Sequence, residues 1–520
     1  MLGNRMAQKS FSQLPEVNIQ RSSFNRSFAA KDTFDFDYLV PIMVDEVLPG
    51  DTVNLSVNTF MRLATQKVPI MDNMYVDFFF FYVPNRLIFD NWEKLLGARE
   101  NPSDSIDFIM PEMDLNTALD LANTIYDKMG LPIDGGGTIK IKNTLPLRAY
   151  LKIWNDWFRD SNLQNSVAVP TDNGPDAMGD FYLLERGKRH DYFTSCLPTP
   201  QRGPAVSIPL GVTAPVISTN TDINFRTAAD ATNRNVVGFG GNAMGYAGSV
   251  LAGSPSFRFG TNTGLQSDLS AVAGTINQLR EAFAMQSLFE LDQRGGTRAV
   301  EIIQTHFNVS VPDFRLQRAE FLGGGTTNIN SHPVANTTST GQATLAAYGT
   351  ASTGNRNIGF SKSFVEHGYI IGLACARGDI TYQQGLDRMW NRSTRYDFFW
   401  PELANLGEQA VLSKEIYADG SVGDETVFGY QERWAEYRYK RSEIRGLFRS
   451  TNPTPLDQWH LAEEFLARPL LNANFIKQMT PIERAIAVTT EPHILADMWF
   501  NYTHARPLPV FSIPSNLARF

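Results

Sequence analysis

The stretch DNMYVDFFFFYVPNRLIFDNW, residues 72–92, holds four consecutive phenylalanines followed by a tyrosine and a valine. Such a run is unfavourable in water, so it must lie in a membrane, in a protein core or against another subunit. A membrane helix needs about 20 apolar residues, whereas the run from Phe78 to Val83 is bounded closely by Asp77 and Pro84. Its aromatic composition predicts a strand buried on both faces, either central in a β-sandwich or with its second face against another chain.

Segments on both sides of this run have strand or helix patterns. Residues 38–44 end at a Pro-Gly turn signal, and residues 52–58 alternate apolar and polar side chains. Strand-like sequence resumes at 299–311, 363–376 and 425–439. Helical spacing of apolar residues predicts helices at 114–132, 145–158 and 275–296. Runs of strands broken by long excursions predict a mainly β fold, a β-sandwich or jelly roll with large insertions.

Length and composition limit the class of protein. A chain of 520 residues is expected to form two domains or one large domain with insertions. A second apolar stretch, residues 369–376, is also too short to cross a bilayer, and the N-terminal sequence lacks the apolar region of a signal peptide. Cys196 and Cys375 are the only cysteines, and two buried, reduced thiols are expected.

The charge is distributed unevenly along the chain. The net charge is −8, which does not indicate a nucleic-acid-binding protein. Residues 1–31, however, contain one acidic residue and five basic ones: Arg5, Lys9, Arg21, Arg26 and Lys31. Two interpretations remain open for this segment: a solvated tail that docks along a neighbour, or an inward-facing arm that contacts phosphates.

Two further segments differ in composition from the rest. Residues 205–274 are poor in charge but keep their aromatic residues, which is unusual for a disordered linker, so we expect an ordered insertion that packs on itself or on copies of itself. Residues 322–359 are rich in Gly, Thr, Ser and Asn, and they predict a surface loop.

The sequence gives no positive evidence for an enzyme. The motif GFGGNA at 238–243 resembles a nucleotide fingerprint, but the helix that must follow it is missing. No two histidines have the spacing of a zinc site, and the adjacent Glu463 and Glu464 diverge on a helix. No catalytic residue, metal or cofactor is therefore predicted.

The segment VFGYQERWAEYRYKRSEIRGLFRS, residues 427–450, interleaves arginines with aromatic residues. This composition is typical of interface hot spots and also of single-stranded nucleic-acid surfaces. The accompanying glutamates favour salt-bridged subunit contacts, with nucleic acid or plain surface as the alternatives. Together with the phenylalanine run, the candidate interface residues are Phe78, Phe80, Arg433, Trp434, Tyr437, Arg438 and Tyr439.

Several long blocks resemble the major capsid proteins of gokushoviruses, small single-stranded DNA phages of the Microviridae. They include the region from YLVPIMVDEVLPGD to FFFFYVPNRLIFDNW, then RGGTRAVEIIQTHFNVSVPDFRLQRAEFLGGG, KSFVEHGYIIGLACARGDITYQQGLDRMWNRSTRYDFFWPELANLGEQAVLSKEIY, GYQERWAEYRYK, LDQWHLAEEF and ARPLPVFSIP. The blocks follow one another in order over nearly the whole chain. The resemblance is weakest at 205–274 and 322–359.

The resemblance implies a viral eight-stranded jelly roll that assembles, through pentamers, into a T=1 shell of about 60 copies around a circular single-stranded DNA genome. The chain is accordingly divided into a basic arm (1–35), a first jelly-roll part with helical insertions (36–204), the insertion 205–274, and the remainder of the jelly roll with the loop 322–359 and a C-terminal arm (275–520). The insertion at 205–274 corresponds to a three-fold surface protrusion thought to meet a host receptor, with candidate contacts Phe225, Phe239, Tyr246, Phe257 and Phe259.

The resemblance also implies partners and a location. Partners are an internal scaffolding protein, a small basic DNA-binding peptide and a pilot protein, without membrane insertion. The location is the virion, and the host bacterial cytoplasm during assembly. A shell of acidic subunits needs basic groups directed inward or supplied by another protein, which the arm and the peptide would provide. The alternative from the residues alone is a carbohydrate-binding or glycoside-hydrolysing jelly roll, with aromatic residues lining a sugar cleft.

Overall fold

The computed structural model describes residues 21–206, 276–315, 317–334, 346–354 and 358–511, and the backbone of seven short strands between residues 216 and 267. Two compact units are present: Met1–Pro200 with Arg294–Phe520, and Gln201–Gln293. Among the described residues, no helix is long and apolar enough to cross a membrane.

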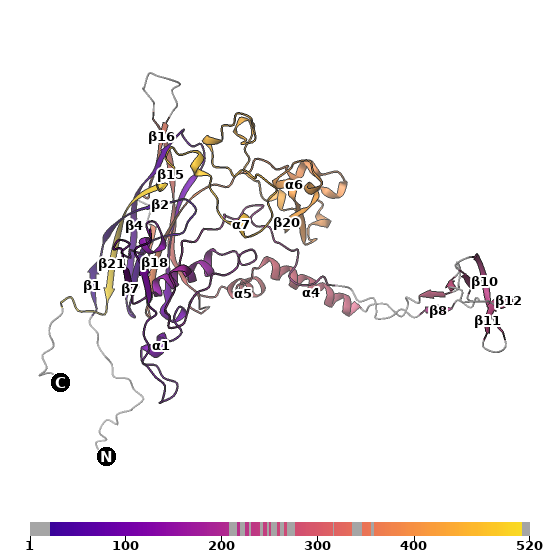
Figure 1. Cartoon of the computed structure of the whole chain (residues 1–520), viewed down its shortest axis with the longest axis horizontal. Coiled ribbons are helices and arrows are strands. Elements are labelled where there is room, and N and C mark those ends of the chain that lie inside the picture. The colour runs from indigo at the N-terminus through magenta and orange to yellow at the C-terminus, as the bar shows by residue number, and fades with distance from the viewer. Residues whose placement is uncertain are drawn as a thin grey trace, which may run out of the picture. The chain divides into compact units, whose positions relative to one another are not determined.

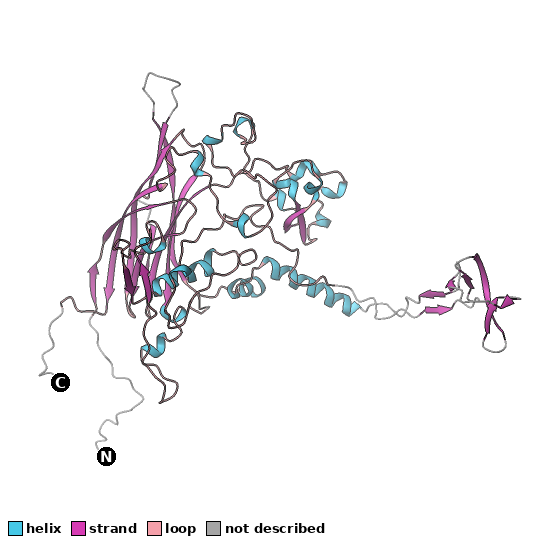
Figure 2. Cartoon of the chain, in the orientation of Figure 1, coloured by secondary structure: helices cyan, strands magenta, loops and turns pink. Residues whose placement is uncertain are grey.

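The larger unit is built on one curled antiparallel sheet of ten strands (Figures 1 and 2). Eight strands follow one another in the order β1-β21-β4-β16-β15-β5-β18-β3, while β2 pairs with β21 and β17 with β4. This confirms the mainly β, jelly-roll-type fold. The strands are β1 (Ser22–Asn25), β2 (Phe28–Phe34), β3 (Val40–Val47), β4 (Thr52–Gln66), β5 (Met74–Pro84), β15 (Glu320–Val334), β16 (Ala346–Ser352), β17 (Ile358–Ser363), β18 (Gly368–Gly378) and β21 (Ile494–Arg506).

The phenylalanine run forms β5, which pairs with β15 on one side and β18 on the other. Side chains alternate across a strand, so Phe78 and Phe80 enter the core inside the curl while Phe81 enters a second core on the outer face. All three are buried within one chain. The predicted central strand is confirmed, and the assignment of Phe78 and Phe80 to a subunit interface is wrong, because neighbouring strands of the same chain already cover them.

Helix α3 (Leu145–Ile153) covers the outer face of β5 and β18, and a π-helical turn follows it (Trp154–Phe158). Leu147 and Leu151 pack there among the residues of the second core. The hydroxyl of Tyr150 donates to the carbonyl oxygen of Leu39 at 2.8 Å. These contacts confirm the helix predicted at 145–158.

Three glycines allow β15 to lie against the phenylalanine run. Gly323, Gly324 and Gly325 stand opposite Phe80, Phe79 and Phe78. A Cβ atom at Gly324 would collide with the carbonyl oxygen of Phe78. The Gly-rich sequence therefore forms a close strand contact, and the surface loop predicted for 322–359 is wrong where β15, β16 and β17 run through it. Residues 335–345 and 355–357 of that prediction lie outside the described residues.

The second half of the predicted N-terminal arm belongs to the sheet. Strands β1 and β2 both pair with β21, with Phe28 opposite Phe500. The two rings stack at 4.6 Å between centroids. Stacking and main-chain pairing thus order residues 22–34, where the sequence showed no sustained periodicity.

Helix predictions outside α3 have mixed outcomes. Helix α4 (Ile276–Arg294) is confirmed, but residues 299–311, predicted as a strand, form α5 (Ala299–Phe307). The carboxylate of Glu301 accepts the backbone N–H of Arg298 at 3.0 Å and caps this helix. The helix predicted at 114–132 is reduced to α2 (Ile125–Lys128), because its first residues form β6 (Met113–Asn116), which pairs with β7 (Thr138–Ile141).

Residues 408–437 contribute to a third core, whose members include Phe193, Tyr382, Val411, Ile416 and Phe428. Strands β19 (Glu408–Leu412) and β20 (Val427–Glu432) pair with each other, and α6 (Ser413–Ile416) follows β19. The strand predicted at 425–439 ends at Glu432, because Trp434 has left-handed backbone angles (φ 67°) and a 3₁₀ turn, Ala435–Tyr437, follows it. The C-terminal part of that segment is therefore directed to the surface.

The smaller unit contains the predicted insertion. Five of its strands form one sheet in the order β12-β11-β10-β9-β13, and β8 pairs with β14. Their bounds are β8 (Val216–Ser218), β9 (Asn224–Thr227), β10 (Asp230–Phe239), β11 (Ala243–Tyr246), β12 (Ser249–Val250), β13 (Phe257–Phe259) and β14 (Leu265–Ser267). The candidate residues Phe225, Phe239, Tyr246, Phe257 and Phe259 lie on four of these strands, and their side chains are outside the described part of the structure.

Candidate assembly surface

Exposed aromatic rings and arginines gather over the third core of the larger unit. Three short 3₁₀ helices, Arg388–Asn391, Arg395–Asp397 and Pro401–Leu403, bring them next to the turn after β20. We call this set the aromatic surface: Arg392, Arg395, Tyr396, Phe398, Phe399, Trp400, Arg433, Trp434 and Tyr437.

Trp434 anchors the aromatic surface from below. Its side chain is buried, and its indole N–H donates to the carbonyl oxygen of Leu403 at 3.0 Å. The ring of Phe399 lies edge-on to it at 5.6 Å, and Tyr437 lies 6.1 Å from it. The left-handed turn at Trp434 therefore fixes two flanking rings that remain about half exposed.

The arginines lie over the exposed rings. The guanidinium of Arg392 is 4.5 Å from the centroid of Tyr437, and that of Arg395 is 5.5 Å from Trp400. Such cation–π contacts hold flat, amphipathic groups at the surface in a fixed arrangement. The residues Tyr396, Phe398, Phe399 and Trp400 are between 42% and 59% exposed in the single chain.

A buried ionic network supports this surface. Glu436 accepts from Gln409 at 2.7 Å and pairs with Arg392 at 3.4 Å. Beneath it, Glu415 accepts from the hydroxyl of Tyr192 at 2.9 Å and from Arg388 at 3.0 Å. Burial raises the pKa of Glu415, and the charge of Arg388 opposes that rise. The network fixes the 3₁₀ segments beneath the exposed rings.

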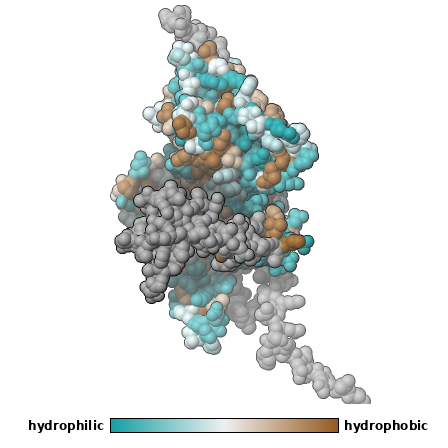
Figure 3. Space-filling model, turned by 90° about the vertical axis from the view of Figure 1, so that its right-hand side faces the viewer, coloured by the Kyte–Doolittle hydropathy of each residue, from teal (hydrophilic) through white to brown (hydrophobic). Residues whose placement is uncertain are grey.

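Such a surface is suited to binding another protein. Tyr, Trp and Arg are the residues enriched at the energetic centres of interfaces, and contiguous exposed apolar groups mark interaction sites on soluble proteins. Figure 3 shows apolar residues breaking the hydrophilic face of the molecule in several separate patches. In the described part of the chain, no group of His, Cys, Asp or Glu residues could hold a metal ion.

Known proteins identify the class of this chain. A family model described as "Capsid protein (F protein)" matches residues 12–516. The chain belongs to this capsid protein family. It is 51% identical over 537 residues to capsid protein VP1 of Bdellovibrio phage phiMH2K, with all of both chains covered. It is 41% identical to capsid protein VP1 of Chlamydia phage 1 and 34% identical to capsid protein VP1 of Spiroplasma virus 4, with 97% of each chain covered in both comparisons.

Membership of the family confirms the resemblance to Microviridae capsid proteins. The protein is a structural component of a virion and not an enzyme. The glycoside-hydrolysing alternative is therefore wrong. A capsid protein functions by contacts with copies of itself, so the aromatic surface is the relevant kind of site.

Of the five interface residues predicted at 433–439, Trp434 is only 4% exposed, so it supports the surface from within its own chain, while the other four reach the surface. Arg433 and Tyr437 belong to the aromatic surface around buried Trp434, while Arg438 and Tyr439 are exposed beside it. Arg438 pairs with Glu432 at 2.5 Å.

The sequence analysis did not single out the segment RSTRYDFFW at 392–400, which supplies most of the exposed rings. The same rule, arginines among aromatics, would have found it.

The basic N-terminal residues that the structure describes differ in how far their charges are neutralised within the chain. Arg5 and Lys9 lie outside the described residues, and Arg21 donates to the hydroxyl of Thr52 at 2.9 Å. Arg26 forms a bidentate pair with Asp45, so its charge is neutralised within the chain. The side chain of Lys31 is 81% exposed and forms a long ion pair with Asp497 at 4.0 Å. Of the three described candidates, Arg21 and Lys31 are exposed and have charges available to an outside partner, whereas Arg26 does not.

Proposed function

We propose that copies of this chain close into a T=1 icosahedral shell of about 60 subunits, through pentamers, around a circular single-stranded DNA genome. The observation that carries this proposal is the aromatic surface, which a single chain leaves uncovered although its composition is that of an interface centre. A second copy that covers it removes half-exposed Phe399, Trp400 and Tyr437 from water. Similarity to three capsid proteins, at 34–51% identity over 97–100% of each chain, supports the same conclusion.

Enclosure of DNA by subunits of net charge −8 needs cations on the inner surface. Residues 1–31, with exposed Lys31, supply part of that charge. A small basic DNA-binding peptide would supply the rest. An internal scaffolding protein and a pilot protein are the other expected partners, with assembly in the host bacterial cytoplasm.

The insertion at 205–274, which belongs to the smaller unit, is the proposed three-fold protrusion that attaches to a host receptor. It folds into sheets of its own, and the family resemblance is weakest there. Deletion of residues 220–270 should abolish attachment to host cells and leave particle formation intact. Attachment at the wild-type level would overturn this role.

Electron microscopy of the purified chain, alone and with its scaffolding protein, tests the shell. Uniform icosahedral particles or pentameric precursors are expected. A monodisperse monomer under every condition would overturn the proposal. Extraction of nucleic acid from the particles, followed by digestion with a nuclease specific for single strands, tests the genome class.

A further inference from the structure

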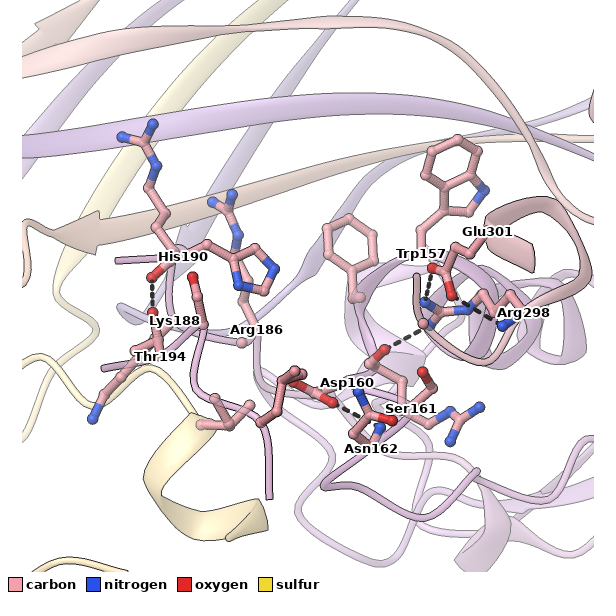
Figure 4. Close-up of a pocket in the computed structure, with 18 of the residues that line it drawn as sticks. Trp157, Asp160, Ser161, Asn162, Arg186, Lys188, His190, Thr194, Arg298 and Glu301 are labelled. Atoms are coloured by element: carbon pink, nitrogen blue, oxygen red, sulfur yellow. Dashed lines mark hydrogen bonds and ion pairs between the residues drawn. The ribbon is translucent and has the colours of Figure 1, made fainter. Parts of the chain in front are cut away.

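A cavity of about 920 Å³ lies at the outer face of the sheet in the larger unit. Pockets that hold small organic ligands typically measure about 300–1,000 Å³, so this one is at the upper end of that range. Its wall includes Phe79 and Phe81 of β5, the π-helical turn with Trp157, and residues 186–190 and 194–197. Figure 4 shows Lys188 and His190 on one side and Trp157, Arg298 and Glu301 on the other.

The cavity wall carries more cationic than acidic side chains. Among the described residues that line it are two carboxylates, Asp160 and Glu301, and six cationic side chains: Arg159, Arg186, Lys188, Arg189, Arg294 and Arg298. Four of the six form ion pairs: Arg186 with Asp77, Lys188 with Glu463 at 2.5 Å, Arg294 with Glu408, and Arg298 with Glu301 at 3.0 Å. These pairs hold that part of the wall in place and neutralise most of its charge.

Two of the arginines that line the cavity, Arg159 and Arg189, have charges that are not paired in the described part of the chain. Within the described residues, no carboxylate forms an ion pair with Arg159 or with the exposed Arg189. The Nε atom of Arg159 is buried and has no hydrogen-bond partner, while its Nη1 donates to the carbonyl oxygen of Gln164 at 2.9 Å. Burial and the neighbouring charge of Arg298 lower the pKa of Arg159. The carboxylates of Asp160, Asp156 and Glu301 oppose this shift, and an anion in the cavity would add to their effect.

Aromatic rings stand beside these cations. The rings of Trp157 and Phe321 are 5.8 Å apart, and Phe321 packs against Phe81 at 5.4 Å. Arg318 covers Trp157, with its guanidinium 4.2 Å from the ring. Phe321, by contrast, is 41% exposed and lines the cavity. Another flat ring can stack on this partly exposed phenylalanine ring.

We propose that this cavity binds a short stretch of single-stranded nucleic acid, with phosphates at Arg159 and Arg189 and a base stacked on Phe321. The inference rests on the proposed enclosure of single-stranded DNA and assigns one site of contact outside the basic N-terminal segment. Cations that track phosphates beside rings that stack bases are the combination used for single strands. An acidic peptide would use the cations but not the exposed ring, and a paired duplex hides its base faces.

Fluorescence anisotropy of a short fluorescein-labelled oligothymidylate with the full-length chain tests the site. Phe321→Ala should weaken binding between about fivefold and a hundredfold, the range for loss of one stacked base. Arg189→Ala should weaken binding and make the slope of log affinity against log salt shallower by about one. Because Arg189 is exposed, this variant does not depend on the tolerance of the core. Matched controls outside the cavity, Phe60→Ala and Arg99→Ala, should bind like the wild type.

Photocrosslinking with an iodouracil-containing single strand locates the contact. Adducts on peptides that contain Trp157, Phe158 or Phe321 are expected, in the free chain and in particles. Adducts confined to residues 1–35, together with unchanged affinity of both variants, would overturn the cavity site while leaving DNA enclosure intact. An acidic peptide that binds the cavity more tightly than the oligonucleotide would also overturn it. Particles without nucleic acid would instead overturn the proposed function itself.

Discussion

The chain contains two dense aromatic runs, FFFF at 78–81 and YDFFW at 396–400, and they have opposite fates. The first is a strand with partners on both sides and a packed layer on both faces, so Phe78, Phe80 and Phe81 are buried within the chain. The second lies in and between 3₁₀ turns with no strand partner, and about half of each ring remains exposed. Aromatic composition therefore predicts that a segment is shielded from water. Backbone geometry determines whether its own chain or another chain shields it.

The largest effect on stability is expected from a substitution in the buried phenylalanine run. Phe80→Ala removes a ring that is fully enclosed and lies 5.7 Å from Phe360. The cavity left behind should lower the free energy of unfolding by about 3–5 kcal/mol. Urea denaturation followed by circular dichroism measures it, with Phe398→Ala in the exposed run as the matched control, expected to change stability by less than about 0.5 kcal/mol. Equal losses at both positions would remove the distinction between the runs.

A change of pH should affect the buried interior of the larger unit and the exposed run differently. Burial raises the pKa of Asp37 to about 6, against hydrogen bonds from Thr480 that lower it. The folded state therefore binds this proton more tightly than the unfolded chain, whose Asp has a pKa of about 4. Stability from this group is present below about pH 4 and is lost as pH rises to about 6, by up to about 3 kcal/mol. Denaturation midpoints of the wild type and Asp37→Asn across this range measure the difference, and the variant should show a flatter profile.

The exposed run should not respond in that window. Backbone N–H groups of Thr394 and Ser393 lower the pKa of Asp397 to about 2, so this carboxylate is charged throughout. Assembly that depends on Asp397 should be unchanged between about pH 4 and pH 6. Light scattering at fixed protein concentration measures it. A transition in that interval that Asp397→Asn abolishes would contradict the assignment.

Contacts of the exposed run should appear in association and not in folding. Phe399→Ala and Tyr437→Ala each remove a ring that flanks buried Trp434. Each should weaken subunit association by about 2 kcal/mol, the lower bound for a hot spot, with little change in the unfolding midpoint. Sedimentation velocity across a concentration series measures the shift toward smaller species. Phe60→Ala, an exposed phenylalanine on β4, is the matched control.

The smallest effect is expected at the edge of the predicted interface segment. Arg445 and Glu443 form a pair at 2.5 Å, in which the arginine is 76% exposed. Solvent-exposed pairs contribute between about 0 and 1 kcal/mol. Arg445→Ala should therefore leave both stability and assembly close to wild type. A strong loss of assembly would extend the contact surface to this residue.

Sequence reasoning succeeded where local pattern and tertiary packing agree. The phenylalanine run, the alternation at 52–58 and the helix at 145–158 all point to the same burial that the structure shows. It failed where a distant partner decides the outcome. The glycines at 323–325 predict a loop from sequence alone, but they form a strand because they pair with Phe78, Phe79 and Phe80. Residues 22–34 form strands because β21 lies beside them.

The candidate site was predictable in part for the same reason. Arginines among aromatics identified Arg433 and Tyr437, since that signal is local. The contribution of 392–400 depends on the turn at Trp434 that brings the two segments together. Neither the spacing nor the charge of Arg159, Arg189 and Phe321 could reveal a shared cavity, because they come from separate parts of the chain.

Oxidative footprinting of assembled and unassembled protein tests most directly whether sister copies cover the aromatic surface. Hydroxyl radicals modify exposed aromatic side chains, so mass spectrometry can compare Phe399, Trp400 and Tyr437 in the two states. Strong protection of these three on assembly is expected, with Phe80 unreactive in both states. Equal modification of the three in free chains and in closed particles would show that the surface stays open to water, which contradicts the account.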